Sequence, residues 1–209
     1  MRILGLDEAG RGCVLGPLVV GGFLCDAAVS DTLKDAGVDD SKRIRPKKRT
    51  ALRAILPQHG TPFLREVSPA QIDAGNINTL EEEAFFEIIC EARPDHVTID
   101  APCHPAAIPN FIARLTRRLQ DAGVPVPQMR VEPKADANYP VVGAASIVAK
   151  VHRDLEIEQL GEVGSGYPSD PVTRAWLLDF IQRDVPFPSC VRTRWGTIDA
   201  LRQTHAEQS

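Results

Sequence analysis

Four carboxylates stand at positions where the sequence pattern ends a strand or begins a helix. The positions are Asp7, Glu8, Asp100 and Asp136. Acids gathered at one place repel one another, because like charges a few ångströms apart resist simultaneous ionisation. Divalent cations relieve that repulsion, and carboxylate oxygens are hard ligands that suit Mg²⁺ or Mn²⁺. Two such ions about 3.5–4 Å apart can activate water and stabilise the leaving oxygen in phosphodiester hydrolysis, so these acids are a candidate site for that chemistry.

Each acid also has a plainer structural explanation. An Asp at the end of a strand commonly caps a turn, an Asp before a helix commonly caps that helix, and Asp7 with Glu8 could form a surface turn. Neighbouring side chains of an extended segment point to opposite faces, so Asp7 and Glu8 reach one site only if the chain turns there. Gly10 and Gly12 allow such a turn. Both explanations stay open for each acid taken alone.

A run of basic residues without an intervening acid is the second feature with chemical potential. It comprises Lys42, Arg43, Arg45, Lys47, Lys48, Arg49 and Arg53. The net charge of −4 does not by itself indicate a nucleic-acid partner. A local basic patch of this kind nevertheless attracts phosphate. The plainer alternative is a solvated helix face.

Short apolar runs separated by turn residues predict the elements that must position these groups. Strands are expected at residues 3–7, 17–25, 63–67, 96–100 and 129–132, the first two forming a hairpin. Helices are expected at 47–56, from a capping-box pattern at Thr79 and Glu82 onward, and at about 108–119, 139–160, 172–183 and 197–205. A hairpin followed by alternating helices and strands predicts an α/β domain with a mixed sheet flanked by helices.

The length of 209 residues fits one domain with a small appendage. We expect a catalytic domain over residues 1–165 and a small C-terminal helical, substrate-binding region over 166–209, which begins within the Gly- and Pro-rich loop at 161–171. No stretch approaches the roughly 18 apolar residues that a membrane span needs. Asp7 interrupts any signal-peptide core, so a cytoplasmic protein is expected. The five scattered cysteines include no CxxC pair and argue against a disulfide framework or a zinc site.

Motifs that run in order along most of the chain resemble those of ribonuclease HII. They are Leu6-Asp7-Glu8-Ala9-Gly10-Arg11-Gly12, Asp40-Ser41-Lys42, Ile99-Asp100, Lys134-Ala135-Asp136, Ala144-Ala145-Ser146-Ile147-Val148-Ala149-Lys150-Val151 with Arg153-Asp154, and Gly164-Ser165-Gly166-Tyr167-Pro168-Ser169-Asp170-Pro171. The last motif and the Lys-Ala-Asp sequence are most similar to the archaeal branch. Together the motifs are far more specific than any of them alone.

The resemblance implies a ribonuclease-H-like fold and a metal site for Mg²⁺ or Mn²⁺ on Asp7, Glu8, Asp100 and Asp136. It implies an endonuclease that cuts the RNA strand of RNA–DNA hybrids and cuts at ribonucleotides embedded in duplex DNA. Water activated between two metal ions would attack the phosphate 5′ to a ribonucleotide. The products would carry 3′-hydroxyl and 5′-phosphate ends.

The resemblance also implies which residues contact the nucleic acid. A glycine–arginine–glycine loop meets the ribose 2′-hydroxyl, a serine–lysine pair contacts phosphate, one helix face lies toward the backbone near the cut, and a tyrosine stacks on the sugar at the junction to DNA. In that order the residues are Gly10, Arg11 and Gly12; Ser41 and Lys42; Ser146, Lys150 and Arg153; and Tyr167. The plainer alternatives are a tight turn, solvated helix faces and a loop anchor. Cys13 stands where the family often has proline, and no chemistry is assigned to it.

Two features separate the chain from the related ribonuclease HIII. The acidic pair lies only six residues from the start, without the long amino-terminal substrate-binding domain of that family, and the fourth carboxylate is Asp136 rather than Glu. Residues 197–209 lack the pattern of a sliding-clamp tether, so a tether of that type is not expected. A monomer without an obligatory protein partner is the default expectation. Two alternatives stay open: another carboxylate-dependent nuclease on the same fold, and a catalytically silent module that binds hybrids through the basic segment.

Overall fold

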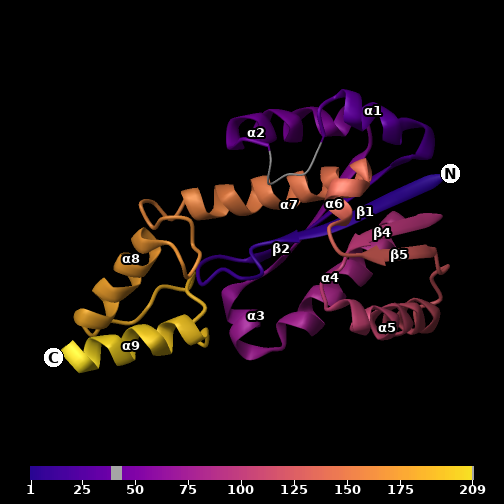
Figure 1. Cartoon of the computed structure of the whole chain (residues 1–209). Coiled ribbons are helices and arrows are strands. Elements are labelled where there is room, and N and C mark those ends of the chain that lie inside the picture. Colours follow the sequence, from indigo (N-terminus) through magenta and orange to yellow (C-terminus); the bar gives the residue numbers. More distant parts are fainter. Residues whose placement is uncertain (39–43, 209) are drawn as a thin grey trace.

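The computed structural model, which describes residues 1–38 and 44–208, contains a five-stranded mixed sheet flanked by helices (Figure 1). The strands are β1 (Arg2–Ala9), β2 (Leu18–Asp26), β3 (Thr61–Val67), β4 (His96–Asp100) and β5 (Gln128–Glu132), in the spatial order β3-β2-β1-β4-β5. The pairs β1–β2 and β2–β3 are antiparallel, whereas β1–β4 and β4–β5 are parallel. The predicted hairpin and the predicted mixed α/β sheet are thereby confirmed.

The helices are α1 (Ser30–Asp35), α2 (Pro46–Ile55), α3 (Pro69–Ala74), α4 (Ile77–Ala92), α5 (Ile108–Asp121), α6 (Ala135–Asn138), α7 (Pro140–Glu158), α8 (Pro171–Gln182) and α9 (Gly196–Gln208). The predicted capping box at Thr79 is wrong, because Asn76 caps α4 by accepting a hydrogen bond from the Asn78 amide. The capping box of this region belongs to Ser68 and Gln71 at the start of α3, a helix that was not predicted. None of the described helices combines the length and the apolar character that crossing a bilayer requires.

Helices cover both faces of the sheet. On one face, α4 and α5 pack around a core that includes Leu4, Leu6 and Phe85. On the other face, α7 lies against the sheet with α1 and α2 outside it, around a core that includes Phe23 (Figure 1). Successive side chains of a strand alternate between faces, so Asp7 points to the side of α7 while Leu6 points to the side of α4.

Two glycines let α7 lie directly on the strand backbones. A Cβ atom at Gly5 of β1 would stand 2.2 Å from the carbonyl oxygen of Val141, and one at Gly21 of β2 would stand 2.3 Å from that of Ala145. Any side chain at either position would push the helix away from the sheet. This close approach brings the first half of α7 beside the end of β1, where Asp7 lies.

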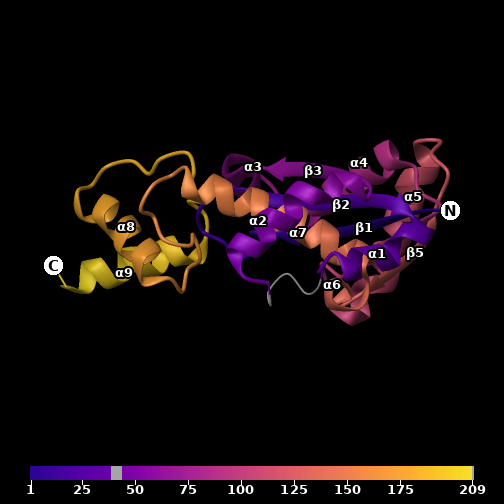
Figure 2. The same ribbon diagram turned by 90° about the horizontal axis from the view of Figure 1, so that it is seen from above.

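The C-terminal helices α8 and α9 lie together at one end of the molecule, beyond the carboxyl end of α7 (Figures 1 and 2). A separate small core there joins Leu15 and Ile157 to Leu177 of α8 and Ile198 of α9. Leu15 also forms an isolated antiparallel bridge with Val191. The C-terminal region therefore shares its core with the loop that follows β1. The expected division of the chain at residue 165 stays a prediction.

Candidate metal centre and substrate surface

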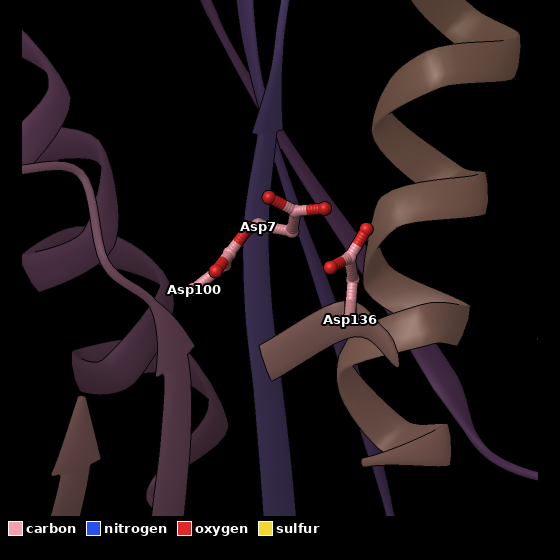
Figure 3. A group of neighbouring side chains, drawn as sticks. All are labelled: Asp7, Asp100 and Asp136. Atoms are coloured by element: carbon pink, nitrogen blue, oxygen red, sulfur yellow. The ribbon is translucent and has the colours of Figure 1, made fainter. Parts of the chain in front are cut away.

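Three aspartates from three different elements converge at one edge of the sheet (Figure 3). Asp7 comes from β1, Asp100 from the end of the neighbouring parallel strand β4, and Asp136 from α6. Each offers a carboxylate oxygen, and these oxygens all lie within 4.8 Å of one another. Asp7 and Asp136 are buried, and Asp100 is half-buried. This is the only such group of possible metal ligands within residues 1–38 and 44–208.

The turn between β5 and α6 sets the position of Asp136. Lys134 caps α6 with φ of 61° and ψ of 34°, a left-handed conformation that costs a non-glycine residue strain. The next residue, Ala135, donates its amide to Oδ1 of Asp100 at 3.0 Å. The strained turn is thus tied to one of the aspartates that it faces. Backbone strain of this kind is typical of functional sites.

The acids at this edge are poorly compensated by the protein itself. Burial raises the pKa of Asp7 well above its ordinary value, and the charges of Glu8 and Asp100 raise it further, against a hydrogen bond from Ser146. Burial and the charge of Asp100 likewise raise the pKa of Glu8 to about 7, although Arg11 opposes the shift. A divalent cation would supply the missing positive charge, and the donors are all hard oxygens. The residues present therefore fit a divalent metal site.

Glu8 lies beside this group but on the other side of the strand. β1 continues through Ala9, with Glu8 paired to Val20, so the chain does not turn between Asp7 and Glu8. The turn comes one residue after the strand, at Gly10 with φ of 82°. Glu8 is consequently outside the three-aspartate group, although its charge is felt at both Asp7 and Asp100. Its role as a fourth ligand stays a prediction.

The loop at Gly10, Arg11 and Gly12 is anchored on one side and open on the other. A Cβ atom at Gly10 would lie 2.6 Å from the Pro17 carbonyl oxygen, so the turn needs glycine there. The Arg11 guanidinium donates hydrogen bonds to Glu81 and Asn78 of α4. Gly12 is exposed, and no atom lies within 4 Å of the position of an added Cβ. A sugar edge could therefore approach the backbone at Gly12.

The three residues predicted on one face of α7 have different surroundings. Ser146 is buried and hydrogen-bonds to Asp7. Lys150 is half-buried, and burial lowers its pKa. Arg153 is buried, and its guanidinium donates to Cys13 Sγ at 2.8 Å and to the Ser165 carbonyl. The solvated-face alternative is therefore wrong for Ser146 and Arg153, and the predicted contacts of all three with nucleic acid stay predictions.

Tyr167 lies next to this cluster, in the loop before α8. The Arg153 guanidinium carbon stands 4.7 Å from the centre of the Tyr167 ring and covers one of its faces. Burial raises the pKa of Tyr167 to about 12, with a further contribution from Cys13. Cys13, to which the sequence assigned no chemistry, is fully buried against this pair. Only the other face of the ring is left for a sugar, and the predicted stacking role stays a prediction.

The basic segment is only partly exposed. Ser41 and Lys42, the predicted phosphate contacts, lie outside the described residues, as does Arg43. Arg49 is buried and lies 3.5 Å from a carboxylate oxygen of Asp154 on α7, so it holds α2 against α7. In the described part of this segment, the exposed cations are Arg45, Lys47 and Lys48, and Arg53 is half-buried.

Two buried charged residues of the site were not predicted from the sequence. Glu81, only 1% exposed, holds Arg11, and Arg192 is fully buried beneath the same loop. Glu81 lies on the same helix face as Phe85 and Ile88, and an acid in an apolar face could have indicated a buried charge. For Arg192 the sequence shows only a charged residue between Val191 and Trp195, and this pattern does not predict burial.

Comparison with known proteins identifies the family. A family model described as Ribonuclease HII matches residues 4–198. The chain belongs to the ribonuclease HII family. Ribonuclease HII of Archaeoglobus fulgidus is 42% identical to it over 209 residues, which cover 95% of this chain and 96% of the relative. Ribonuclease HII of Pyrococcus furiosus is 38% identical over 211 residues, which cover 98% of this chain and 92% of the relative.

Solved structures of the family have the same fold. Ribonuclease H2 from Pyrococcus horikoshii OT3 matches with a TM-score of 0.85 and 38% identity, over 99% of this chain and 100% of that one. The structure of the PCNA:RNase HII complex from Archaeoglobus fulgidus matches with a TM-score of 0.84 and 39% identity, over 99% and 100%. Bst-RNase HIII in complex with Mn²⁺ has a TM-score of 0.76 at 17% identity, over 100% of this chain and 71% of that one, which shows the fold alone. The predicted ribonuclease-H-like fold is confirmed.

Membership of the ribonuclease HII family also confirms the predicted enzyme class. The chain is a metal-dependent hydrolase that cleaves RNA in RNA–DNA hybrids and at ribonucleotides embedded in DNA. The aspartate group at the edge of the sheet provides the acidic site that a divalent metal needs. The two alternatives, a different nuclease on the same fold and a silent binding module, do not agree with this membership.

Proposed function

We propose that the chain binds two divalent cations, Mg²⁺ or Mn²⁺, through Asp7, Glu8, Asp100 and Asp136, and cuts the phosphodiester bond 5′ to a ribonucleotide. The products carry 3′-hydroxyl and 5′-phosphate ends. The observation that carries the proposal is the convergence of three aspartate oxygens within 4.8 Å of one another. The charge of Asp100 also raises the pKa of Glu8, so this fourth acid interacts with the group. Bound divalent cations would lower the pKa of a water molecule and neutralise charge on the leaving oxygen.

The chain itself would hold these ligands in place. The hydrogen bond from Ser146 fixes the carboxylate of Asp7, and the amide of Ala135 fixes that of Asp100. Because these two contacts come from α7 and from the turn before α6, the helices next to the sheet determine the geometry of the site. Preorganised ligands of this kind do not have to be ordered during the reaction.

Recognition of the ribonucleotide is proposed for the loop at Gly10, Arg11 and Gly12 together with Tyr167. The open backbone at Gly12 supports an approach of the 2′-hydroxyl, which is the group that separates RNA from DNA. The half-buried ring of Tyr167, with Arg153 over one face, supports stacking of its other face on the sugar at the junction. Ser41, Lys42 and the exposed cations of α2 would contact phosphates of an RNA–DNA hybrid or of duplex DNA that contains ribonucleotides.

The proposal also includes the absence of an obligatory protein partner. One relative has been solved in a complex with PCNA, which is a property of that protein. We expect the purified chain to cleave its substrate without a second protein.

A cleavage assay on a DNA duplex with a single ribonucleotide tests the proposal. We expect one cut, mapped to the 5′ side of the ribonucleotide, that requires Mg²⁺ or Mn²⁺ and stops when the metal is chelated. An identical duplex with deoxyribonucleotides only is the control and should stay intact. Cleavage of the control at a similar rate, a cut on the 3′ side, or full activity without metal would overturn the proposal.

A further inference from the structure

Arg192 lies fully buried beneath the loop that follows β1. Its guanidinium donates to three main-chain carbonyls: Nη2 to Gly10 at 2.7 Å, Nη1 to Arg11 at 3.0 Å and Nε to Gly16 at 3.0 Å. The Arg192 amide also donates to the Val14 carbonyl at 2.9 Å. One residue of the C-terminal region therefore holds both ends of the loop.

The guanidinium has no carboxylate within ion-pair distance in the part of the chain that the structure describes. Carbonyl dipoles and the Trp195 ring, 5.1 Å from the guanidinium carbon, surround the charge instead. Burial lowers the pKa of Arg192 to about 10, so the side chain stays charged at neutral pH. Burying an arginine without an acidic partner is costly. The hydrogen bonds of Arg192 to the three loop carbonyls offset this cost.

The direction of the carbonyls fixes the direction of the neighbouring amides. In a trans peptide the C=O of one residue and the N–H of the next point in opposite directions. Because the carbonyls of Gly10 and Arg11 point inward to Arg192, the amides of Arg11 and Gly12 point outward. Neither amide donates to a protein acceptor within the described residues. Both are available to a ligand on the exposed side of the loop, where Gly12 lies in open space.

We propose that Arg192 is a positioning residue for ribonucleotide recognition, which turns the Arg11 and Gly12 amides outward as donors to the ribose 2′-hydroxyl. The inference rests on the proposed role of the loop. It assigns the C-terminal region a part in choosing RNA over DNA, through a side chain that touches neither substrate nor metal. The amides are preorganised because a planar guanidinium satisfies three carbonyls at once.

Binding measurements on Arg192→Lys test the proposal. The affinity for a duplex with one ribonucleotide is compared with that for the same duplex with deoxyribonucleotides only, in a Ca²⁺ buffer under which cleavage is shown to be absent. A lysine keeps the charge but satisfies fewer carbonyls. We expect the preference for the ribonucleotide to fall tenfold or more, toward one, and kcat/KM in Mg²⁺ to fall with it. The rise of the melting temperature on addition of Mg²⁺ should not change, because the aspartates are untouched.

Arg2→Lys is the matched control. Arg2 also donates to two main-chain carbonyls, those of Ala92 and Arg93, but at the opposite end of β1. The Arg2→Lys variant should prefer the duplex with one ribonucleotide as strongly as the wild type does. A wild-type preference that survives Arg192→Lys in a folded protein overturns this inference alone, whereas equal binding of both duplexes by the wild type overturns the proposed function with it.

If Arg192→Lys does not fold, the outward direction of the amides can be tested on the wild type by NMR titration of its amide signals. The Arg11 and Gly12 ¹H–¹⁵N signals should shift on addition of the ribonucleotide duplex and should shift much less with the deoxyribonucleotide duplex. The Arg2 amide, which donates to Asp95 Oδ2 at 2.7 Å, should respond to neither. Identical responses of the Arg11 and Gly12 signals to both duplexes would overturn the proposal.

Discussion

The amide of Ala135 donates a hydrogen bond to Oδ1 of Asp100 at 3.0 Å, so the aspartate that ends β4 also orders the turn that carries Asp136. One carboxylate thereby has two tasks, one electrostatic and one structural. The two can be separated by substitution, because an amide oxygen still accepts a hydrogen bond whereas a methyl group does not.

Asp100→Asn should keep the fold and lose about a thousandfold in cleavage rate, equivalent to about 4 kcal/mol of transition-state stabilisation. The neutral side chain weakens metal coordination but still accepts from Ala135. Its melting temperature without metal should equal or exceed that of the wild type, because the charge of Asp100 raises the pKa of both Asp7 and Glu8. Asp100→Ala, the matched variant, should melt lower. A cleavage rate of Asp100→Asn near the wild-type value would show that the metal assignment is wrong.

The stability of the metal-free protein should fall as the pH rises from about 5 to 8. The pKa of Glu8 is raised from 4.5 to about 7 in the folded state, chiefly by burial. A group of this kind contributes stability that is fully present below its unfolded pKa and is lost as the pH rises through its folded pKa. Melting temperatures in EDTA across this range measure the loss, and Glu8→Gln should reduce the slope. A slope equal to that of the wild type would contradict the assignment to Glu8.

Divalent metal should stabilise the protein more at pH 8 than at pH 5. Ligands bind metal in their deprotonated form. Burial raises the pKa of Glu8 to about 7 and raises that of Asp7, so protons compete with the metal more strongly at the lower pH. The difference in melting temperature with and without Mn²⁺ at the two pH values is the measurement. An equal rise at both would mean that other groups bind the ion.

Lys42→Ala should weaken binding of every duplex and reduce the slope of log affinity against log salt by about one, as the loss of one phosphate contact requires. Affinity measured between about 50 and 200 mM salt gives the slope. Arg117→Ala serves as the control, because Arg117 is an exposed cation on α5, away from the predicted basic segment. An unchanged slope for Lys42→Ala would contradict the phosphate contact and favour the alternative of a solvated residue.

Tyr167→Ala should slow cleavage at a single ribonucleotide by about 10- to 100-fold, because stacking on nucleic acid contributes roughly 1–3 kcal/mol. Long hybrids should suffer less, since neighbouring ribonucleotides offer alternative registers. Tyr167→Phe keeps the ring beneath Arg153 and should retain much of the activity. Equal losses of Tyr167→Ala on both substrates, together with a lower melting temperature, would favour a loop anchor.

The sequence predicted the strands and most helices because apolar periodicity reports burial directly. It also brought Asp7, Asp100 and Asp136 together correctly, through motifs that each name a strand end or a helix start. It did not predict that β1 runs on through Ala9, because a local pattern does not say where a strand stops, and the role of Glu8 as a fourth ligand stays a prediction.

The contacts that sequence reasoning missed are long-range ones. Arg192 and Gly10 are 182 positions apart, and Glu81 and Arg11 are 70 apart. The sequence next to Arg192 or Glu81 does not indicate which distant residue either of them contacts. The cap at Asn76 was missed for a different reason, because the pattern at Thr79 and Glu82 matches a capping box as well as the true start of α4 does.

Helix α7 connects the two ends of the proposed catalytic surface at a fixed spacing. Ser146 contacts Asp7, and Arg153, seven residues later, contacts Tyr167. Seven residues are nearly two full turns, so both side chains leave the same face about 10 Å apart along the axis. With the roles proposed for Asp7 and Tyr167, the helix would set the distance between the metal site and the sugar at the junction to DNA. Inserting one residue between Ser146 and Arg153 would rotate Arg153 by about 100° around the helix axis. The aspartate group would stay intact, but Arg153 would no longer lie over the Tyr167 ring.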